Sequence, residues 1–163
     1  MGAMSSGMPE VQITPAAPDD AEWCARLMAS SEPWLTLRRD YNAACAALRL
    51  PGRELFLARQ DNQPVGFILL SPHGLAASPY INSIAVDPGF RGRGVGTALL
   101  NFAERHFAGR KHLFLLVSSF NKKAQNLYRR HGYAFVGELK GYVVPEHDEL
   151  IFCKKLANVE RGR

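Results

Sequence analysis

Apolar residues recur along the chain with two different periods, one typical of strands and the other of helices. Runs rich in β-branched, aromatic and leucine residues predict strands, and apolar residues three or four positions apart predict helices. The predicted elements are, in chain order, a strand at 11–14, a helix from Asp19 or Asp20 to about Ser30, a helix from Trp34 to about Leu50, strands at 54–60, 65–70 and 80–86, a helix at 97–107, a strand at 112–118, a helix at 121–131, and strands at 133–139 and 149–155. This mixture of strands and helices indicates an α/β (α+β) fold.

The connections between these elements are mostly short. Asp61-Asn62-Gln63-Pro64 supplies a hairpin turn, whereas residues 71–79 and 141–148 predict longer loops of the kind that can border a substrate pocket. The continuous apolar run at 113–117 predicts a strand that is covered on both faces at the centre of a sheet. With 163 residues, 47% of them hydrophobic, we expect one domain at 11–157, preceded by a disordered or tag-derived segment at 1–10 and followed by a tail at 158–163.

The composition of the chain limits the kinds of ligand, cross-link and cellular location that we expect. The formal net charge of +5 favours an anionic ligand, although a solvated basic surface would give the same value. Cys24, Cys45 and Cys153 are widely spaced, which favours reduced thiols over a disulfide framework or a metal site. No apolar run reaches the roughly 20 residues of a membrane span, and the N-terminus lacks the order of a secretory signal. We therefore expect a cytoplasmic monomer or homodimer without a metal or a membrane partner.

The stretch Arg91-Gly92-Arg93-Gly94-Val95-Gly96 lies between the predicted strand at 80–86 and the predicted helix at 97–107. The first backbone N–H groups of a helix have no intrahelical partners, so a helix N-terminus attracts anions. The three glycines leave those N–H groups accessible, and the two arginines add full positive charges. The loop therefore predicts a phosphate or diphosphate site.

Three classes of phosphate-binding loop differ in their spacing. A P-loop needs Lys and then Ser or Thr after its last glycine, but Gly96 is followed by Thr97 and Ala98. The dinucleotide fingerprint needs a Gly or Ala where Thr97 stands, at the start of a βαβ unit, and this loop lies in mid-chain. The order Arg-x-x-Gly-x-Gly, directly after a strand and an Asp-Pro turn, instead resembles the coenzyme A pyrophosphate loop of the GCN5-related N-acetyltransferase (GNAT) family.

A second motif supports this resemblance. It is similar to the Asn-to-Tyr helix of the same family and runs Asn121-x-x-Ala124-x-x-Leu127-Tyr128-x-x-x-Gly132-Tyr133. The two motifs together cover roughly residues 81–133 and stand in the order and separation of the family. The resemblance implies a mixed, mostly antiparallel sheet of about six or seven strands with about four helices. It also implies that the sheet splays between the strands at 80–86 and 112–118, where acetyl-CoA would bind.

The resemblance further implies roles for individual residues. Backbone groups at the end of the strand at 80–86 would pair with the pantetheine arm and polarise the acetyl carbonyl. Asn121 would hydrogen-bond the same arm, although it also suits a helix N-cap. Tyr128 would be the general acid that protonates the departing thiolate, with a core tyrosine as the alternative. The implied cofactor-binding residues are Ile84, Ala85, Val86, Arg91, Gly92, Arg93, Gly94, Val95, Gly96, Thr97, Asn121, Ala124 and Tyr128.

The general base is where the sequence departs from the family pattern. Some members carry a glutamate on one of the two central strands, at places that correspond here to Asn82 and Leu116. The remaining candidates are Glu32, His73, Glu138 and His147, or a water molecule held by Ser83, Ser118 or Ser119. A weak base favours an acceptor amine of low pKa, such as an α-amine, because deprotonating it at neutral pH needs less free energy.

The two motifs do not specify the acceptor amine. The candidates for its pocket are Glu32, Trp34, Tyr80, Asn82 and Tyr142, with Tyr41 as a further aromatic side chain. We expect an acetyl-CoA-dependent N-acetyltransferase in which a primary amine attacks the thioester directly. The alternatives are transfer of another acyl group from its CoA thioester, and a non-catalytic domain that senses CoA or binds nucleic acid, for which the sequence has no recognised motif.

Overall fold

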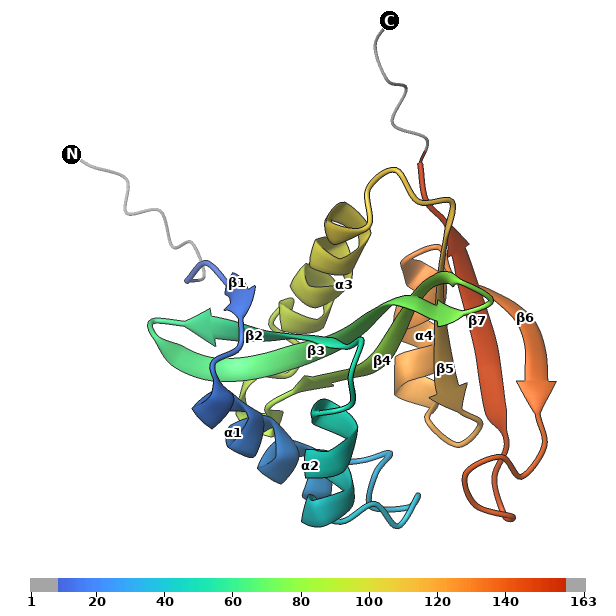
Figure 1. Ribbon diagram of the computed structural model, residues 1–163, viewed down its shortest axis with the longest axis horizontal. Helices are drawn as coiled ribbons and strands as arrows, with labels where there is room; N and C mark the ends of the chain where they lie inside the picture. Colours follow the sequence, from blue (N-terminus) through green and yellow to red (C-terminus); the bar gives the residue numbers. More distant parts are fainter. Residues whose placement is uncertain (1–8, 158–163) are drawn as a thin grey trace, which may run out of the picture.

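The computed structural model describes residues 9–157, which form one seven-stranded sheet with helices on both faces (Figure 1). The strand order is β1-β2-β3-β4-β5-β7-β6, and β4 and β5 form the parallel pair in an otherwise antiparallel sheet. The elements are β1 (Gln12–Pro15), α1 (Pro18–Ala29), α2 (Tyr41–Leu48), β2 (Glu54–Gln60), β3 (Gln63–Leu75), β4 (Ser78–Val86), α3 (Val95–His106), β5 (His112–Ser118), α4 (Lys122–Arg130), β6 (Ala134–Leu139) and β7 (Glu149–Lys155), with a 3₁₀ turn at Pro88–Phe90. The predicted sheet and its flanking helices are confirmed.

The two faces of the sheet bury separate cores. α3 and α4 cover one face, and α1 and α2 cover the other (Figure 1). β3 contributes to both cores, since Ile68 and Leu70 pack on the α3–α4 face while Phe67 and Leu69 pack on the α1–α2 face. A strand of this kind has a continuous apolar sequence because neither of its faces meets water.

The sheet opens between its two central strands. β4 and β5 pair at only two positions of β4, Tyr80 and Ile81, and then diverge. Asn82 is the extra residue of a bulge at this point, because the register of β4 against β3 shifts there. Within the described residues, the edge of β4 that faces β5 therefore has no strand partner along residues 82–86. The predicted splay is confirmed, and we call this point of divergence the fork.

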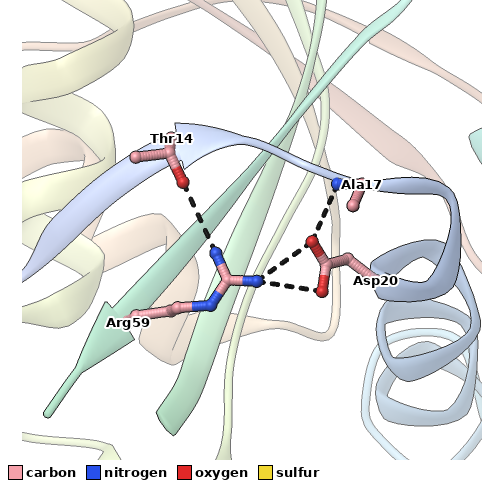
Figure 2. Close-up of polar contacts among 4 residues, drawn as sticks. All are labelled: Thr14, Ala17, Asp20 and Arg59. Atoms are coloured by element: carbon pink, nitrogen blue, oxygen red, sulfur yellow. Dashed lines mark hydrogen bonds and ion pairs between the residues drawn. The ribbon is translucent and has the colours of Figure 1, made fainter. Parts of the chain in front are cut away.

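Figure 2 shows how the N-terminal part of the chain is attached to the sheet. Asp20 accepts the Ala17 backbone N–H at 2.8 Å and pairs with the Arg59 guanidinium of β2 at 3.0 Å. The same guanidinium donates to Thr14 Oγ1 of β1 at 3.4 Å. The predicted cap at Asp19 or Asp20 is wrong, because Pro18 begins the helix and Asp20 lies inside its first turn.

The predicted helix from 34 to about 50 is wrong over its first half. The structure has turns at 32–38 and begins α2 only at Tyr41. Arg38 adopts a left-handed φ of 57°, and Asp40 then accepts a backbone N–H of the first turn of α2 at 2.9 Å. A side chain that caps the backbone in this way ends the preceding segment and starts a new helix.

The predicted loop at 71–79 is also wrong, because a hairpin occupies most of that range. β3 extends to Leu75 and β4 begins at Ser78. Ala76 and Ala77 form the turn between them, with φ values of 49° and 61°. A tight hairpin turn of this kind usually contains glycine or asparagine, so two alanines conceal it from sequence patterns.

The ends of the chain are described only in part. Residues 1–8 and 158–163 lie outside the described residues, and with them the predicted tail and most of the predicted N-terminal segment. Pro9 belongs to that segment, and its carbonyl accepts a hydrogen bond from Gln60 Nε2 at 2.9 Å. Pro9 therefore contacts the end of β2.

Three further findings concern the expectations from composition. The three cysteines are free, as predicted. Their apolar or helical surroundings in the sequence also predict burial, which is confirmed for Cys24 and wrong for the half-buried Cys45 and Cys153. No helix within residues 9–157 is long and apolar enough to cross a membrane. Over the same residues, His, Cys, Asp and Glu side chains form no group of three or more that could hold a metal ion.

Candidate active site

A cavity of about 890 Å³ lies at the fork. Its walls come from the end of β3, from β4 and β5, from α4, from the α1–α2, α2–β2 and β6–β7 connections, and from the start of β7. Segments that are far apart in the sequence therefore meet around one space. The site residues predicted from sequence that line it are Glu32, Trp34, Tyr80, Asn82, Ile84, Asn121, Ala124, Tyr128 and Tyr142, whereas Ala85, Val86 and residues 91–97 do not.

The glycine loop lies at the N-terminus of α3, beside the end of β4. Gly92 and Gly94 have left-handed φ values of 74° and 84°, and nothing lies within 4 Å of a Cβ built at either position. Arg93 stacks over the Phe90 ring at 5.4 Å, and Arg91 Nε donates to the last carbonyl of β4 at 3.3 Å. The loop is therefore open, positively charged and held in a conformation that favours glycine, which fits a diphosphate.

The remaining loop residues pack α3 against its neighbours. Val95 is buried in the core of the α3–α4 face, and Thr97 is half-buried. A Cβ on Gly96 would lie 3.4 Å from Leu127 Cδ2, an ordinary van der Waals contact, so Gly96 lies directly against α4. The backbone N–H groups of these three residues lie in the first turn of α3, where a helix supplies no intrahelical partner for them.

α4 is positioned by hydrogen bonds at its first turn. Asn121 Oδ1 accepts the Ala124 backbone N–H at 3.3 Å, so Asn121 is the N-cap of the helix. The buried Gln125 donates through Nε2 to the carbonyls of Ser118 and Ser119, both at 3.1 Å, and thereby ties α4 to the end of β5. Asn121 also lines the cavity, and the cap does not use its amide NH₂ group as a donor.

Tyr128 lines the cavity from α4, and only 6% of its surface is exposed. Burial raises the pKa of its hydroxyl above the usual tyrosine value, and the neighbouring Tyr80 adds to this shift. The hydroxyl therefore stays protonated at neutral pH and is available as a donor. The ring also packs with Tyr133 and Phe152, so a core position and a place in the cavity are compatible for this residue.

Glu149, the first residue of β7, was not among the site residues predicted from the sequence. It is 5% exposed, lines the cavity and accepts a hydrogen bond from Ser118 Oγ at 2.7 Å. Burial raises the pKa of the Glu149 carboxyl, while the Ser118 hydrogen bond and the charges of Arg39 and His147 lower it in part. A carboxylate with a raised pKa suits proton transfer near neutral pH. The signal in the sequence was a glutamate directly before the apolar run at 150–153 of a predicted strand.

Tyr128 and Glu149 reach the cavity from opposite faces of the sheet. α4 packs on the α3–α4 face, where Leu150 and Phe152 of β7 also contribute to the core. Because side chains alternate along a strand, Glu149 and Ile151 point to the α1–α2 face. The fork thus brings a buried phenol from one face and a buried carboxylate from the other to the same cavity.

The predicted base candidates differ in their surroundings. Glu32 lines the cavity, but its carboxylate oxygens accept hydrogen bonds from the Thr36 N–H and hydroxyl at 3.1 and 2.8 Å. His73 lines the cavity from the exposed β3–β4 hairpin. Glu138 and His147 do not line it.

The two strand positions that the resemblance singled out, Asn82 and Leu116, both line the cavity. Asn82 accepts a hydrogen bond from Ser71 Oγ at 2.6 Å, and neither residue has a carboxylate. Glu149 lies beside Ser118 in the register of β5 and β7. The cavity therefore contains a buried carboxylate, that of Glu149. The expectation of an acceptor amine of low pKa rested on the lack of a carboxylate base, so it no longer follows.

Aromatic side chains form part of the cavity wall. Trp34 is buried, Tyr80 is half-buried and Tyr142 is exposed. Burial, together with the nearby Glu149 charge, raises the pKa of Tyr80 to about 12, so its hydroxyl is also neutral. Tyr41 begins α2 outside the cavity, and its predicted place in the wall is wrong.

The comparison with known families agrees with this geometry. The model of the Acetyltransferase (GNAT) family matches residues 18–133, which is more than half of the chain. The matched region contains the glycine loop, the fork and Tyr128. The chain therefore belongs to the GNAT acetyltransferase family.

Individual relatives match shorter regions. The chain is 35% identical over 95 residues to an uncharacterized N-acetyltransferase of Methanocaldococcus jannaschii, covering 54% of this chain and 42% of that protein. It is 38% identical over 81 residues to streptothricin acetyltransferase of Streptomyces lavendulae, covering 47% and 42%. The matches thus span less than half the length of these curated relatives.

A solved structure shows the same fold over nearly the whole chain. The aminoglycoside 6′-N-acetyltransferase complexed with coenzyme A superposes with a TM-score of 0.72 and 18% sequence identity. The superposition covers 90% of this chain and 97% of that one. At this identity the similarity supports the fold alone.

Proposed function

We propose that this chain transfers the acetyl group of acetyl-CoA to a primary amine by direct attack of the amine on the thioester. The observation that carries this proposal is the fork, where β4 and β5 pair at only two positions beside a cavity that contains Tyr128. The unpaired edge of β4 offers backbone groups for the pantetheine arm and an N–H for the acetyl oxygen. The glycine loop, with Arg91 and Arg93, offers a site for the diphosphate.

Two proton transfers accompany the reaction. In our proposal, Glu149 takes the proton that the attacking amine loses, and Tyr128 supplies the proton that the departing thiolate gains. The nitrogen–carbon bond forms and the carbon–sulfur bond breaks, so the products are an acetamide and the CoA thiol. A buried phenol gives up its proton only to a strong base, and a thiolate that leaves into a poorly solvated cavity is such a base.

Family membership supports acetyl-CoA as the acyl donor. The structure of the aminoglycoside 6′-N-acetyltransferase with coenzyme A supports a coenzyme A site on this fold. The Methanocaldococcus relative is also named as an N-acetyltransferase, which supports an amine acceptor.

Calorimetry with acetyl-CoA tests the donor site. We expect micromolar binding to the wild type and a loss of at least about tenfold in the Arg91→Ala, Gly94→Ala double variant, because a guanidinium contact to phosphate is removed. Alanine strains the left-handed φ at Gly94, so an Arg91→Ala, Arg93→Ala variant separates loss of charge from loss of loop geometry. Absence of binding to the folded wild type would contradict the proposal.

An amine panel with detection of free thiol then tests catalysis. Acetyl-CoA is compared with propionyl-CoA and longer acyl-CoA thioesters as donors. We expect acetyl-CoA to give the highest kcat/KM. Faster transfer of a longer chain would instead identify another acyltransferase on the same fold.

A further inference from the structure

Two arginine side chains line the cavity without an acidic partner. Arg39 and Arg53 both belong to its wall, and none of the ion pairs among residues 9–157 includes either of them. The neighbouring Arg38 differs, because its guanidinium pairs with Glu146 at 2.6 Å. Arg38 has a left-handed backbone and directly precedes Arg39, so the two adjacent arginine side chains have different surroundings.

The two guanidinium groups lie near enough to affect each other. Burial lowers the pKa of Arg53, the neighbouring Tyr80 opposes this shift, and the charge of Arg39 adds a smaller lowering. Arg53 donates through Nη1 to the Ala47 carbonyl of α2 at 2.8 Å, which orients the side chain but supplies no negative charge. Arg39 is exposed and Arg53 is half-buried, and an anion bound between them would relieve the repulsion of their like charges.

The phosphates of the acyl donor have a separate candidate site. The glycine loop, with Arg91 and Arg93, begins α3 and does not line the cavity. Arg39 and Arg53 flank α2, which covers the opposite face of the sheet (Figure 1). Arg39 and Arg53 therefore line the cavity from the α1–α2 face, apart from the glycine loop proposed for the donor phosphates.

We propose that the acceptor is a small primary amine that also carries a carboxylate or similar anionic group within a few bonds of its nitrogen, and that Arg39 and Arg53 bind that group. This inference rests on the proposed function. Glu149 supplies the negative end of the same cavity, and the charge of Arg39 acts on it although the two residues form no ion pair. A zwitterionic amine complements these charges, with its ammonium group toward Glu149 and its anionic group toward the two arginines.

The test compares matched amines with three forms of the protein. The standard L-amino acids, their carboxamides, 2-aminoethylphosphonate and polycationic aminoglycosides are assayed for release of free thiol from acetyl-CoA. The proteins are the wild type, Arg39→Gln and a control, Arg49→Gln, whose arginine is exposed and does not line the cavity.

We expect the wild type to acetylate at least one anionic amine faster than its carboxamide. Arg39→Gln lowers kcat/KM for that anionic amine by about 10- to 100-fold, the scale of a lost charge-assisted hydrogen bond, and changes the carboxamide by less than about threefold. Arg49→Gln changes neither rate. The Kd for acetyl-CoA stays the same in all three proteins. The anionic amine with the highest kcat/KM then shows whether the acceptor carries a carboxylate or a phosphonate.

The contrary results differ for this inference and for the proposed function. Faster acetylation of carboxamides or aminoglycosides than of every anionic amine overturns the inference and leaves the proposed function intact. An equal loss for acid and carboxamide in Arg39→Gln, or weaker acetyl-CoA binding, also overturns it.

If no amine consumes the thioester, the proposed function fails. The inference is then decided by the quenching of Trp34 fluorescence by amino acids, measured in a Trp23→Phe background. Quenching that is lost in Arg39→Gln supports it, and its absence from the Trp23→Phe protein overturns it.

Discussion

The two sides of the fork are built by different means. On the α3–α4 side, the glycine loop and the start of α4 are short contiguous segments whose ligand groups follow from local geometry, such as the φ of 84° at Gly94 and the Asn121 cap. On the α1–α2 side, separate segments meet through side-chain contacts such as Arg38 with Glu146 and Ser118 with Glu149. In our proposal the acyl donor binds on the α3–α4 side and the acceptor amine on the α1–α2 side. The donor side is thus specified by local geometry and the acceptor side by tertiary contacts.

This difference has consequences for substitutions in the chain. In our proposal, a substitution in a local motif on the α3–α4 side removes acetyl-CoA binding or the proton donor itself. A substitution on the α1–α2 side alters which amine reacts and leaves acetyl-CoA binding intact.

The largest effect is expected for Tyr128→Phe, which removes the proposed proton donor. We expect kcat to fall by up to about 1,000-fold while the Kd for acetyl-CoA stays the same, because a general acid acts only in the chemical step. Steady-state kinetics and calorimetry measure the two quantities. Tyr133→Phe is the matched control, since its hydroxyl is buried without a partner in the described residues and does not line the cavity. Unchanged turnover in Tyr128→Phe would remove that residue from the mechanism.

Glu149→Gln should lower kcat/KM by about 100-fold for an acceptor amine with a pKa near 10. The loss should shrink as the amine pKa falls, because an amine that is already neutral does not need a base. A series of acceptor amines of graded pKa measures this trend. Glu138→Gln, at an exposed position outside the cavity, is the control. A loss that is independent of the amine pKa would indicate a structural role for Glu149 instead.

The same variant should affect stability in the opposite direction. Burial raises the pKa of Glu149, so its ionised form destabilises the fold at neutral pH. We therefore expect Glu149→Gln to have a Tm equal to or above that of the wild type at pH 7. This advantage should decline as the pH falls through the raised pKa, because the wild-type carboxyl then becomes neutral as well. Thermal melts between pH 4 and pH 8 measure it, and a Tm below the wild type at pH 7 would contradict the prediction.

The smallest effect is expected for Arg38→Ala, which removes the ion pair between the α1–α2 and β6–β7 connections. Both side chains are more than half exposed, and exposed pairs contribute little to stability. We expect an unchanged Tm and a change in acceptor KM of no more than about threefold. A charge swap, Arg38→Glu with Glu146→Arg, should restore the wild-type KM. A large loss of acetyl-CoA binding in Arg38→Ala would contradict the division between the two sides.

Much of the fold could be predicted because its signals are local. Apolar periodicity identified the strands of the sheet, and Asp61-Asn62 identified a turn whose residues both have positive φ. Prediction failed where an ordinary residue adopts an unusual conformation. Ala76 and Ala77 form a tight turn without its usual sequence signal, and Arg38 interrupts a segment that reads as helical.

The family, the glycine loop and the Asn-to-Tyr helix could be identified from the sequence alone, because contiguous motifs carry each of them. The divergence of the two central strands followed from the family resemblance that those motifs carry. Only the tertiary structure brought Glu149, Arg39 and Arg53 to one cavity. The physical reason is that burial and pairing of a charge depend on neighbours far away in the chain. Ser118, which holds the Glu149 carboxylate, lies 31 residues before it, and no local pattern records that contact.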